Sequence, residues 1–406
     1  MAAARMGWGH WHHNGSAWVH AIGWVLVFAV LHQQMNMGEL TVVLLTLALA
    51  EVLARLLLAG SDEGPRPLDG QDMLGRALGR WLALSVLIIA LFTMRSASFY
   101  TSRPFALVCL IGLLLILVLL KICRICAARA GSDRPGMQNL RMGLNAAVLW
   151  GISKLGPLDA DVAILAILLT YLLLLLQPLA RAMPQLRQPG GTRIQPGPSV
   201  IDLLQGGFRN CDLLAIPFLF AREEPLPYLV ARGLVWVVPL AVDHLEVSAR
   251  QSVFAARASN GGRAFVPTMA RVNLGLMLVG GAAALLVLAV AEWLQSRALG
   301  DMIVRNDLVL WLLLGSCAPV IFGATRMLTS VTQMRRDAAL LQLGGMLLFV
   351  GLLAVSEQVT LLALARSFGL MQIGTIAAIS ALLAYSEGVW PGLTALFFRQ
   401  IRLWDR

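Results

Sequence analysis

Apolar runs of about 18 to 22 residues, separated by short polar segments, recur along the whole chain. A helix needs roughly 20 apolar residues to cross a hydrocarbon layer of ~30 Å, so each run predicts one membrane-spanning helix. The predicted spans are 17–33, 39–58, 80–95, 104–122, 142–157, 161–180, 203–221, 226–248, 272–292, 307–325, 338–356 and 369–398. The pattern therefore indicates an all-α polytopic membrane protein with about 12 transmembrane helices.

The composition is that of a membrane protein and argues against a soluble globular protein. Of the 406 residues, 58% are hydrophobic and only 13% are charged, and the mean hydropathy is +0.75. Such a chain has too few polar side chains to cover a soluble globule. No cofactor or metal is expected, because His10, His12 and His13 lack acidic neighbours and the Cys123/Cys126 pair lacks a second pair.

The basic residues alternate between the two faces that these spans define. With both termini in the cytoplasm, 22 of the 32 Lys and Arg residues fall in inner segments and seven in outer segments. This asymmetry follows the positive-inside rule and supports the count of twelve. The net charge of +10 is therefore attributed to topology, and no nucleic-acid partner is expected.

One inner segment differs from the others in being rich in Pro and Gly. The sequence "RAMPQLRQPGGTRIQPGPSV" (181–200) lies between the sixth and seventh spans. It predicts an N-terminal six-helix lobe at 1–185, a cytoplasmic linker at 186–202 and a C-terminal six-helix lobe at 203–406. In two-lobed transporters the substrate route lies between the repeats, so a central cavity is expected there.

The span at 226–248 carries a polar face. At about 100° per residue, its polar positions share an arc of roughly 80°. They are Tyr228, Arg232, Trp236, Pro239, Asp243, Glu246 and, past the end of the span, Arg250. A charge at the centre of a membrane costs on the order of 2.5 to 3.5 kcal/mol, so this face is expected to line a water-filled cavity.

Two further spans contain charges that are candidates for a functional role. Arg209 and Asp212 share a face of the span at 203–221. They either form a neutralising pair that holds two helices together, or Arg209 joins Arg232 in attracting an anionic headgroup while Asp212 balances charge or accepts a proton. Glu387, in the last span, is a candidate for proton coupling or for a hydrogen bond at a kink expected at Pro391.

The second half of the chain resembles a known family. The order "GGFRNCDLLAIPFLF", "EEPLPYLVARGLVW", a basic loop and "RVNLGLMLVGGAAALLVLAVAE" is similar to the second lobe of polysaccharide and lipid-linked oligosaccharide flippases. Their superfamily includes the MATE multidrug exporters. Asp212 followed by Tyr228 and Ala231-Arg232, and the final "PGLTALFFRQI", also fit this resemblance.

The resemblance implies a MATE-like fold and transport by alternating access, without enzymatic activity. The implied substrate is an undecaprenyl-diphosphate-linked glycan, taken from the cytoplasmic leaflet of a bacterial inner membrane. The implied partners are this lipid-linked glycan, membrane lipid and a glycan polymerase or chain-length regulator.

Two alternatives stay open. A proton- or sodium-coupled MATE-type multidrug exporter would need unpaired carboxylates in its cavity, and the two intramembrane arginines argue against it. A membrane-embedded glycan polymerase or ligase would need a large outer loop, which the predicted topology lacks.

Overall fold

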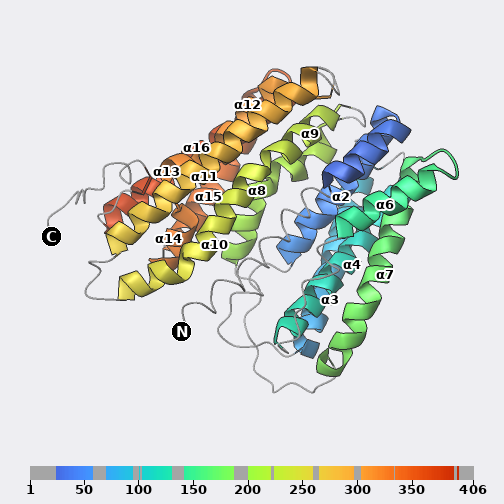
Figure 1. Cartoon of the computed structure of the whole chain (residues 1–406), viewed down its shortest axis with the longest axis horizontal. Coiled ribbons are helices and arrows are strands. Elements are labelled where there is room, and N and C mark those ends of the chain that lie inside the picture. Colours follow the sequence, from blue (N-terminus) through green and yellow to red (C-terminus); the bar gives the residue numbers. More distant parts are fainter. Residues whose placement is uncertain are drawn as a thin grey trace. The chain divides into compact units, whose positions relative to one another are not determined.

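The computed structural model describes residues 24–57, 70–94, 100, 103–129, 141–186, 200–220, 224–258, 265–296, 303–332, 334–387 and 391–392. Nearly all of these residues are helical, and none of them lies in a strand. The chain divides into two compact units, Met1–Leu226 and Pro227–Arg406. Each unit is a bundle of helices, coloured blue to green and yellow to red in Figure 1.

The first unit is built from long apolar helices that pack along one another. Its labelled helices are α2 (Met37–Leu57), α3 (Gly70–Met94), α4 (Pro104–Arg129), α6 (Arg141–Ser153), α7 (Ala160–Leu186) and α8 (Val200–Leu219), and an unlabelled helix spans Trp24–Gln34. The α4 helix packs along α2 and α7, and α6 folds back against α7. Because α2 is covered by several neighbours, its side chains are buried on nearly every face, as expected for a bundle interior.

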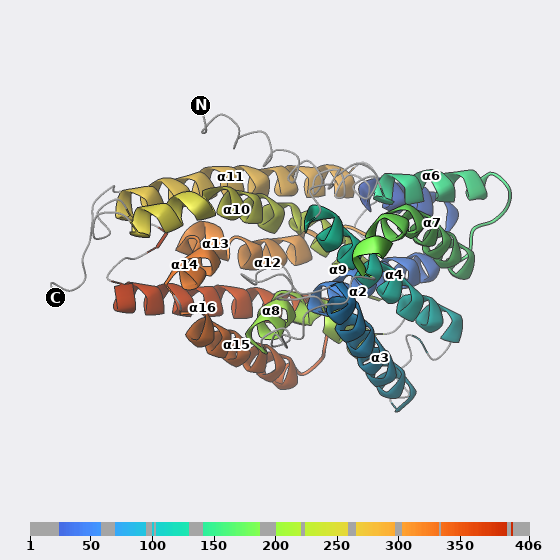
Figure 2. The same cartoon turned by 90° about the horizontal axis from the view of Figure 1, so that it is seen from below.

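The second unit packs its helices in layers. They are α9 (Leu226–Val235), α10 (Val237–Ala258), α11 (Phe265–Leu294), α12 (Asn306–Ser316), α13 (Ala318–Phe322), α14 (Thr325–Val331), α15 (Arg335–Val355) and α16 (Leu361–Glu387). Figure 2 shows the chain from α12 to α14 running between the α10–α11 pair and α16, with α15 on the far side of α16.

Glycines allow α12 and α16 to approach closely. A Cβ atom added at Gly369 would lie 2.5 Å from the carbonyl oxygen of Trp311, and one added at Gly315 would lie 3.0 Å from Cα of Gly369. Small residues at such crossings increase van der Waals contact, which is the main attraction between helices in lipid. The contact places α16 at the centre of the second unit.

Seven helices have the length and apolar composition to cross a membrane, within the described part of the chain. They are Met37–Leu57, Pro104–Cys123, Ala160–Pro184, Leu226–Ala258, Phe265–Leu294, Arg335–Val355 and Leu361–Ser386, and the bent pair Asn306–Phe322 with Thr325–Val331 would make an eighth. The structure thus confirms an all-α membrane protein with several spans. The count of twelve stays a prediction, because the helices at the other predicted spans are shorter or less apolar.

The boundary between the two compact units, after Leu226, does not coincide with the predicted linker at 186–202. Residues 187–199 lie outside the described part of the chain. The helix that the sequence assigns to the start of the second lobe, α8, belongs to the first unit, where Gly206 faces the side chain of Leu56 on α2. The proposed lobes at 1–185 and 203–406 stay a prediction.

Candidate functional site

The polar face predicted for 226–248 lies on one helical path through α9 and α10. Trp236 joins the two helices, since its backbone N–H donates to the carbonyl of Arg232 (3.1 Å) and its carbonyl accepts from Leu240 N–H (3.2 Å). Of the polar side chains, Tyr228 is fully buried and Glu246 is 7% exposed. Arg232, Trp236 and Asp243 are half-buried. The face therefore packs against other parts of the second unit along much of its length.

Arg232 lies against an aromatic side chain of α16. Its guanidinium carbon is 4.8 Å from the centre of the Phe368 ring. Phe368 is itself buried and meets Phe349 of α15 edge to face, with ring centres 6.5 Å apart. A ring face stabilises a nearby cation, and a guanidinium carries several N–H donors that suit an anion. This geometry suits the recognition of an anion between α9 and α16.

Asp243 pairs with Arg326, which lies outside the polar face predicted from the sequence. Arg326 Nη1 of α14 donates to Asp243 Oδ1 of α10 at 3.3 Å. The two residues are 83 positions apart, and Arg326 directly follows the predicted span at 307–325. Nothing in the linear pattern links them, because their approach depends on how α14 is directed.

The direction of α14 comes from a break in the helix before it. The segment Asn306–Phe322 and α14 form an angle of 47°. Gly323 lies at the break with φ of +87°, a left-handed conformation that glycine adopts without a steric penalty. A Cβ at this position would meet the backbone nitrogen of Gly392 at 2.6 Å, so the returning chain after α16 also needs glycine here.

Side chains from two other helices bind the backbone groups exposed by this break. Asn273 of α11 accepts a hydrogen bond from Ala324 N–H through its side-chain oxygen (3.1 Å). Ser380 of α16 donates its hydroxyl to the carbonyl of Phe322 (3.2 Å). Irregular backbone at membrane depth is tolerated only where such partners are present, and broken helices commonly mark binding sites in transporters.

Arg209 and Asp212 lie in the first unit, on α8. The intervening Asn210 leaves the helical conformation, with φ −134° and ψ 17°, and its side-chain amide donates to the carbonyl of Gly206 (3.0 Å). Asp212 is fully buried, and Arg209 is half-buried. These two residues and the polar face of α9–α10 therefore belong to different units, and their convergence on one cavity stays a prediction. Glu387 ends α16, and its side chain lies outside the described residues.

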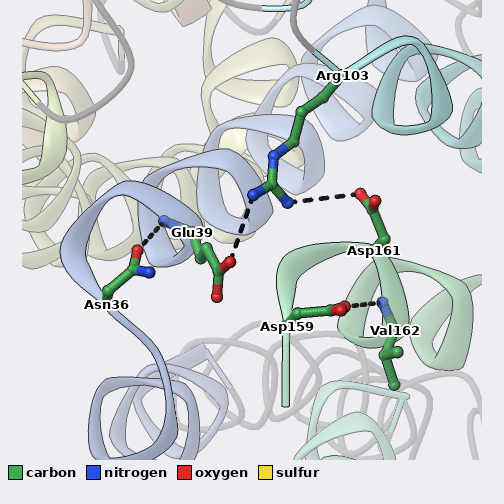
Figure 3. A network of polar contacts seen from close by, with 6 residues as sticks. All are labelled: Asn36, Glu39, Arg103, Asp159, Asp161 and Val162. Carbon is green, nitrogen blue, oxygen red and sulfur yellow. Dashed lines mark hydrogen bonds and ion pairs between the residues drawn. The ribbon is translucent and has the colours of Figure 1, made fainter. Parts of the chain in front are cut away.

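The first unit holds a polar network that sequence reasoning missed. Arg103, directly before the first residue of α4, lies between two carboxylates (Figure 3). Its guanidinium is 3.3 Å from Glu39 in the first turn of α2 and 3.7 Å from Asp161 in the first turn of α7. Acidic side chains are favoured at helix N-termini, and Arg103 balances their charge where these helices begin.

The same end of the first unit has two helix caps. Asn36 accepts a hydrogen bond from Glu39 N–H (2.9 Å), and Asp159 accepts one from Val162 N–H (2.8 Å). Side-chain oxygens at these positions satisfy amide groups that have no partner within the helix. The network is accordingly structural: it fixes where α2 and α7 start.

Within the described ranges, no three His, Cys, Asp or Glu side chains gather closely enough to hold a metal ion. His10, His12 and His13 lie outside those ranges.

Comparisons with known proteins do not identify a family, so the functional assignment rests on this geometry and on the resemblance in the second half of the chain. No family model matches the chain, and neither a curated protein nor a solved structure matches it.

Proposed function

We propose that this protein is a translocase of lipid-linked oligosaccharides or exopolysaccharide precursors in a bacterial inner membrane. The substrate is a glycan on a polyprenyl diphosphate, and transport proceeds by alternating access between two lobes. The resemblance in the second half of the chain supplies the substrate class.

One observation carries the proposal: a half-buried arginine in a helix that is apolar enough to span the membrane, held against an aromatic ring. Leu226–Ala258 is long and apolar enough to cross the membrane, yet it contains Arg232 over Phe368. Charges within spans are expensive and generally serve an ion or substrate pathway. The aromatic ring stabilises the cation, and the planar fork of guanidinium donors is suited to the oxygens of a diphosphate.

The other site residues receive roles that follow from their positions. Arg209 provides a second cation for the headgroup from α8, and Asp212 beside it balances that charge or accepts a proton. Tyr228, Trp236 and Glu246 line the same route from α9 and α10 and contact the glycan. Glu387 is the further candidate for proton coupling.

The ion pair of Asp243 with Arg326 weighs against export of cationic drugs. A site for a cationic drug requires carboxylates that attract positive charge, whereas this carboxylate already faces a guanidinium. Arg232 of the polar face and Arg326 of α14, which contacts that face, supply positive charge, which favours an anionic substrate.

Transport in proteoliposomes tests the proposal. We expect wild-type protein to move a fluorescent polyprenyl-diphosphate sugar between leaflets and to leave a cationic dye untouched. Arg232→Ala is expected to slow lipid movement at least ~10-fold, because a desolvated charge contact to the headgroup is lost. Arg232→Lys should retain part of the rate, since the charge remains without the planar fork.

Arg366→Ala provides the matched control. Arg366 also stacks on an aromatic ring, that of Trp311 at 5.2 Å, but its side chain is exposed. Its loss should leave lipid movement near the wild-type rate. Normal lipid movement by Arg232→Ala would contradict the headgroup role, and dye efflux without lipid movement would assign the chain to drug export.

A further inference from the structure

The pair formed by Asp243 and Arg326 is open to a ligand and loosely made. The side chain of Arg326 is 53% exposed and that of Asp243 is 36% exposed. Their shortest contact is 3.3 Å, whereas a well-formed charge-assisted N–H to O bond is about 2.7 to 2.9 Å. Exposed ion pairs of this kind contribute little to stability, so another anion can replace the carboxylate on Arg326 at little cost.

A purely structural explanation for the pair is weak. Asp243 lies within the apolar span Leu226–Ala258, where an apolar side chain would insert at lower cost. An exposed ion pair also holds two helices together only weakly. The position of Arg326 is nevertheless defined, because Asn273 and Ser380 hold the helix break from which α14 starts.

Carboxylate and phosphate present similar oxygens to a guanidinium. Both accept two parallel N–H bonds from its planar fork, and a diphosphate brings more negative charge than one carboxylate. A diphosphate that reaches Arg326 therefore competes directly with Asp243. In the expected topology Arg326 follows a span that ends at the cytoplasmic face, where the lipid-linked substrate is loaded.

We infer that Asp243 is a placeholder: in the empty protein it occupies the position on Arg326 that a substrate phosphate takes during loading. This inference rests on the proposed function and adds a residue, Arg326, to its headgroup site. The diphosphate displaces the carboxylate, and the carboxylate returns to Arg326 when the substrate leaves. A ligand without the anion does not open the pair, so the exchange selects for diphosphate.

Binding to purified full-length protein in nanodiscs tests the placeholder. The probes are geranylgeranyl diphosphate, inorganic diphosphate and geranylgeraniol. Asp243→Asn is expected to bind geranylgeranyl diphosphate ~3- to 5-fold more tightly, because the competing charge is gone. Arg326→Gln should bind it at least ~10-fold more weakly. The double variant should match Arg326→Gln, because without Arg326 the carboxylate no longer competes with the diphosphate for that cation.

Arg336→Gln and Asp337→Asn, exposed neighbours in the first turn of α15, make the same charge changes and should leave binding unaltered. Geranylgeraniol should bind all variants equally. A gain for both diphosphates assigns recognition to the anion itself, and a gain for the lipid alone adds the tail; either supports the placeholder. Asp243→Ser is the second variant should Asp243→Asn not remain monodisperse.

Unchanged or weaker binding of geranylgeranyl diphosphate to Asp243→Asn and Asp243→Ser overturns the placeholder. That result leaves the proposed function intact, provided that wild-type proteoliposomes move the lipid. The proposed function fails separately if the wild-type protein moves no lipid.

Discussion

Three arginines of this chain differ in the side chains that they contact. Arg232 rests on the Phe368 ring, Arg326 faces Asp243, and Arg103 lies between Glu39 and Asp161. Each arrangement lowers the cost of a cation among apolar helices, but the surroundings differ. The Arg103 guanidinium is only 18% exposed and has two carboxylates, which is the geometry of a structural contact. The Arg326 side chain is 53% exposed, and its contact with Asp243 is as long as that of Arg103 with Glu39.

The surroundings of Tyr100, which precedes Arg103 in the chain, change the pKa of its hydroxyl. Its side chain is buried, and burial raises the pKa of the hydroxyl above its usual value, despite a hydrogen bond with Thr46 that lowers it. The hydroxyl is thus protonated at physiological pH and shares a hydrogen bond of 3.1 Å with Thr46 of α2. This contact supports α2 next to the Arg103 network.

Arg103→Gln is expected to destabilise the protein by about 1 to 2 kcal/mol, since two partly buried carboxylates would lose their cation. The midpoint of thermal unfolding in detergent measures this change. Arg181→Gln, an exposed arginine near the other end of α7, should shift the midpoint little. Equal midpoints for the two variants would show that the network does not hold the helix starts together.

Among the helices, the most informative departure from the expected pattern is the broken segment α12–α14. The sequence predicts one uninterrupted span at 307–325 and a kink near Pro391, within a last span at 369–398. In the structure the segment 307–325 is bent at Gly323. The helix α16 covers Leu361–Glu387, and the kink near Pro391 stays a prediction, because residues 388–390 and 393–398 lie outside the described part of the chain. Gly392, which follows α16, contributes to the packing of the break, because it lies against Ile321 and Phe322.

Gly392→Ala is expected to destabilise the second unit by about 1 to 3 kcal/mol. The residue has φ of +90°, which disfavours any side chain, and a Cβ would collide with the carbonyl oxygen of Ile321. Gly281→Ala in α11 is the control, since its Cβ would meet no atom within 4 Å and alanine favours helix. Thermal unfolding of both variants decides the matter; similar midpoints would contradict a tightly packed break.

For the whole molecule, the number of membrane crossings is the main expectation left to measure. The helix α6 has thirteen residues, which at 1.5 Å per residue is ~20 Å, less than a hydrocarbon core of ~30 Å. The chain then turns at Lys154 and Leu155 and returns as α7. Whether α6 crosses decides the side on which this turn lies.

Topology reporters fused after residues 155, 195, 300, 334 and 358 test the twelve-span arrangement. The basic residues predict alternation, with 195 and 334 in the cytoplasm and 155, 300 and 358 outside. Alkaline phosphatase activity reports outer positions, and green fluorescence reports inner ones. Cytoplasmic signals at both 155 and 195 would remove α6 and α7 as two separate crossings and reduce the count.

The sequence alone predicts much of the helical framework, because hydropathy acts within each segment. Runs of apolar residues must form helices in lipid, where every backbone group needs a partner inside its own segment. For this reason each predicted span overlaps a helix of the described residues, including helices too short to be counted as crossings. The polar face of α9–α10 is likewise a property of one helix, so its residues could be named from their spacing.

Tertiary structure decided the contacts between distant segments. Arg326 meets Asp243 only because Asn273, Ser380 and Gly323 hold a break that redirects α14. Arg103 meets Glu39 and Asp161 only because three helices start at the same end of the first unit. Such contacts depend on packing between residues far apart in the chain, which no local pattern of hydrophobic and polar positions encodes.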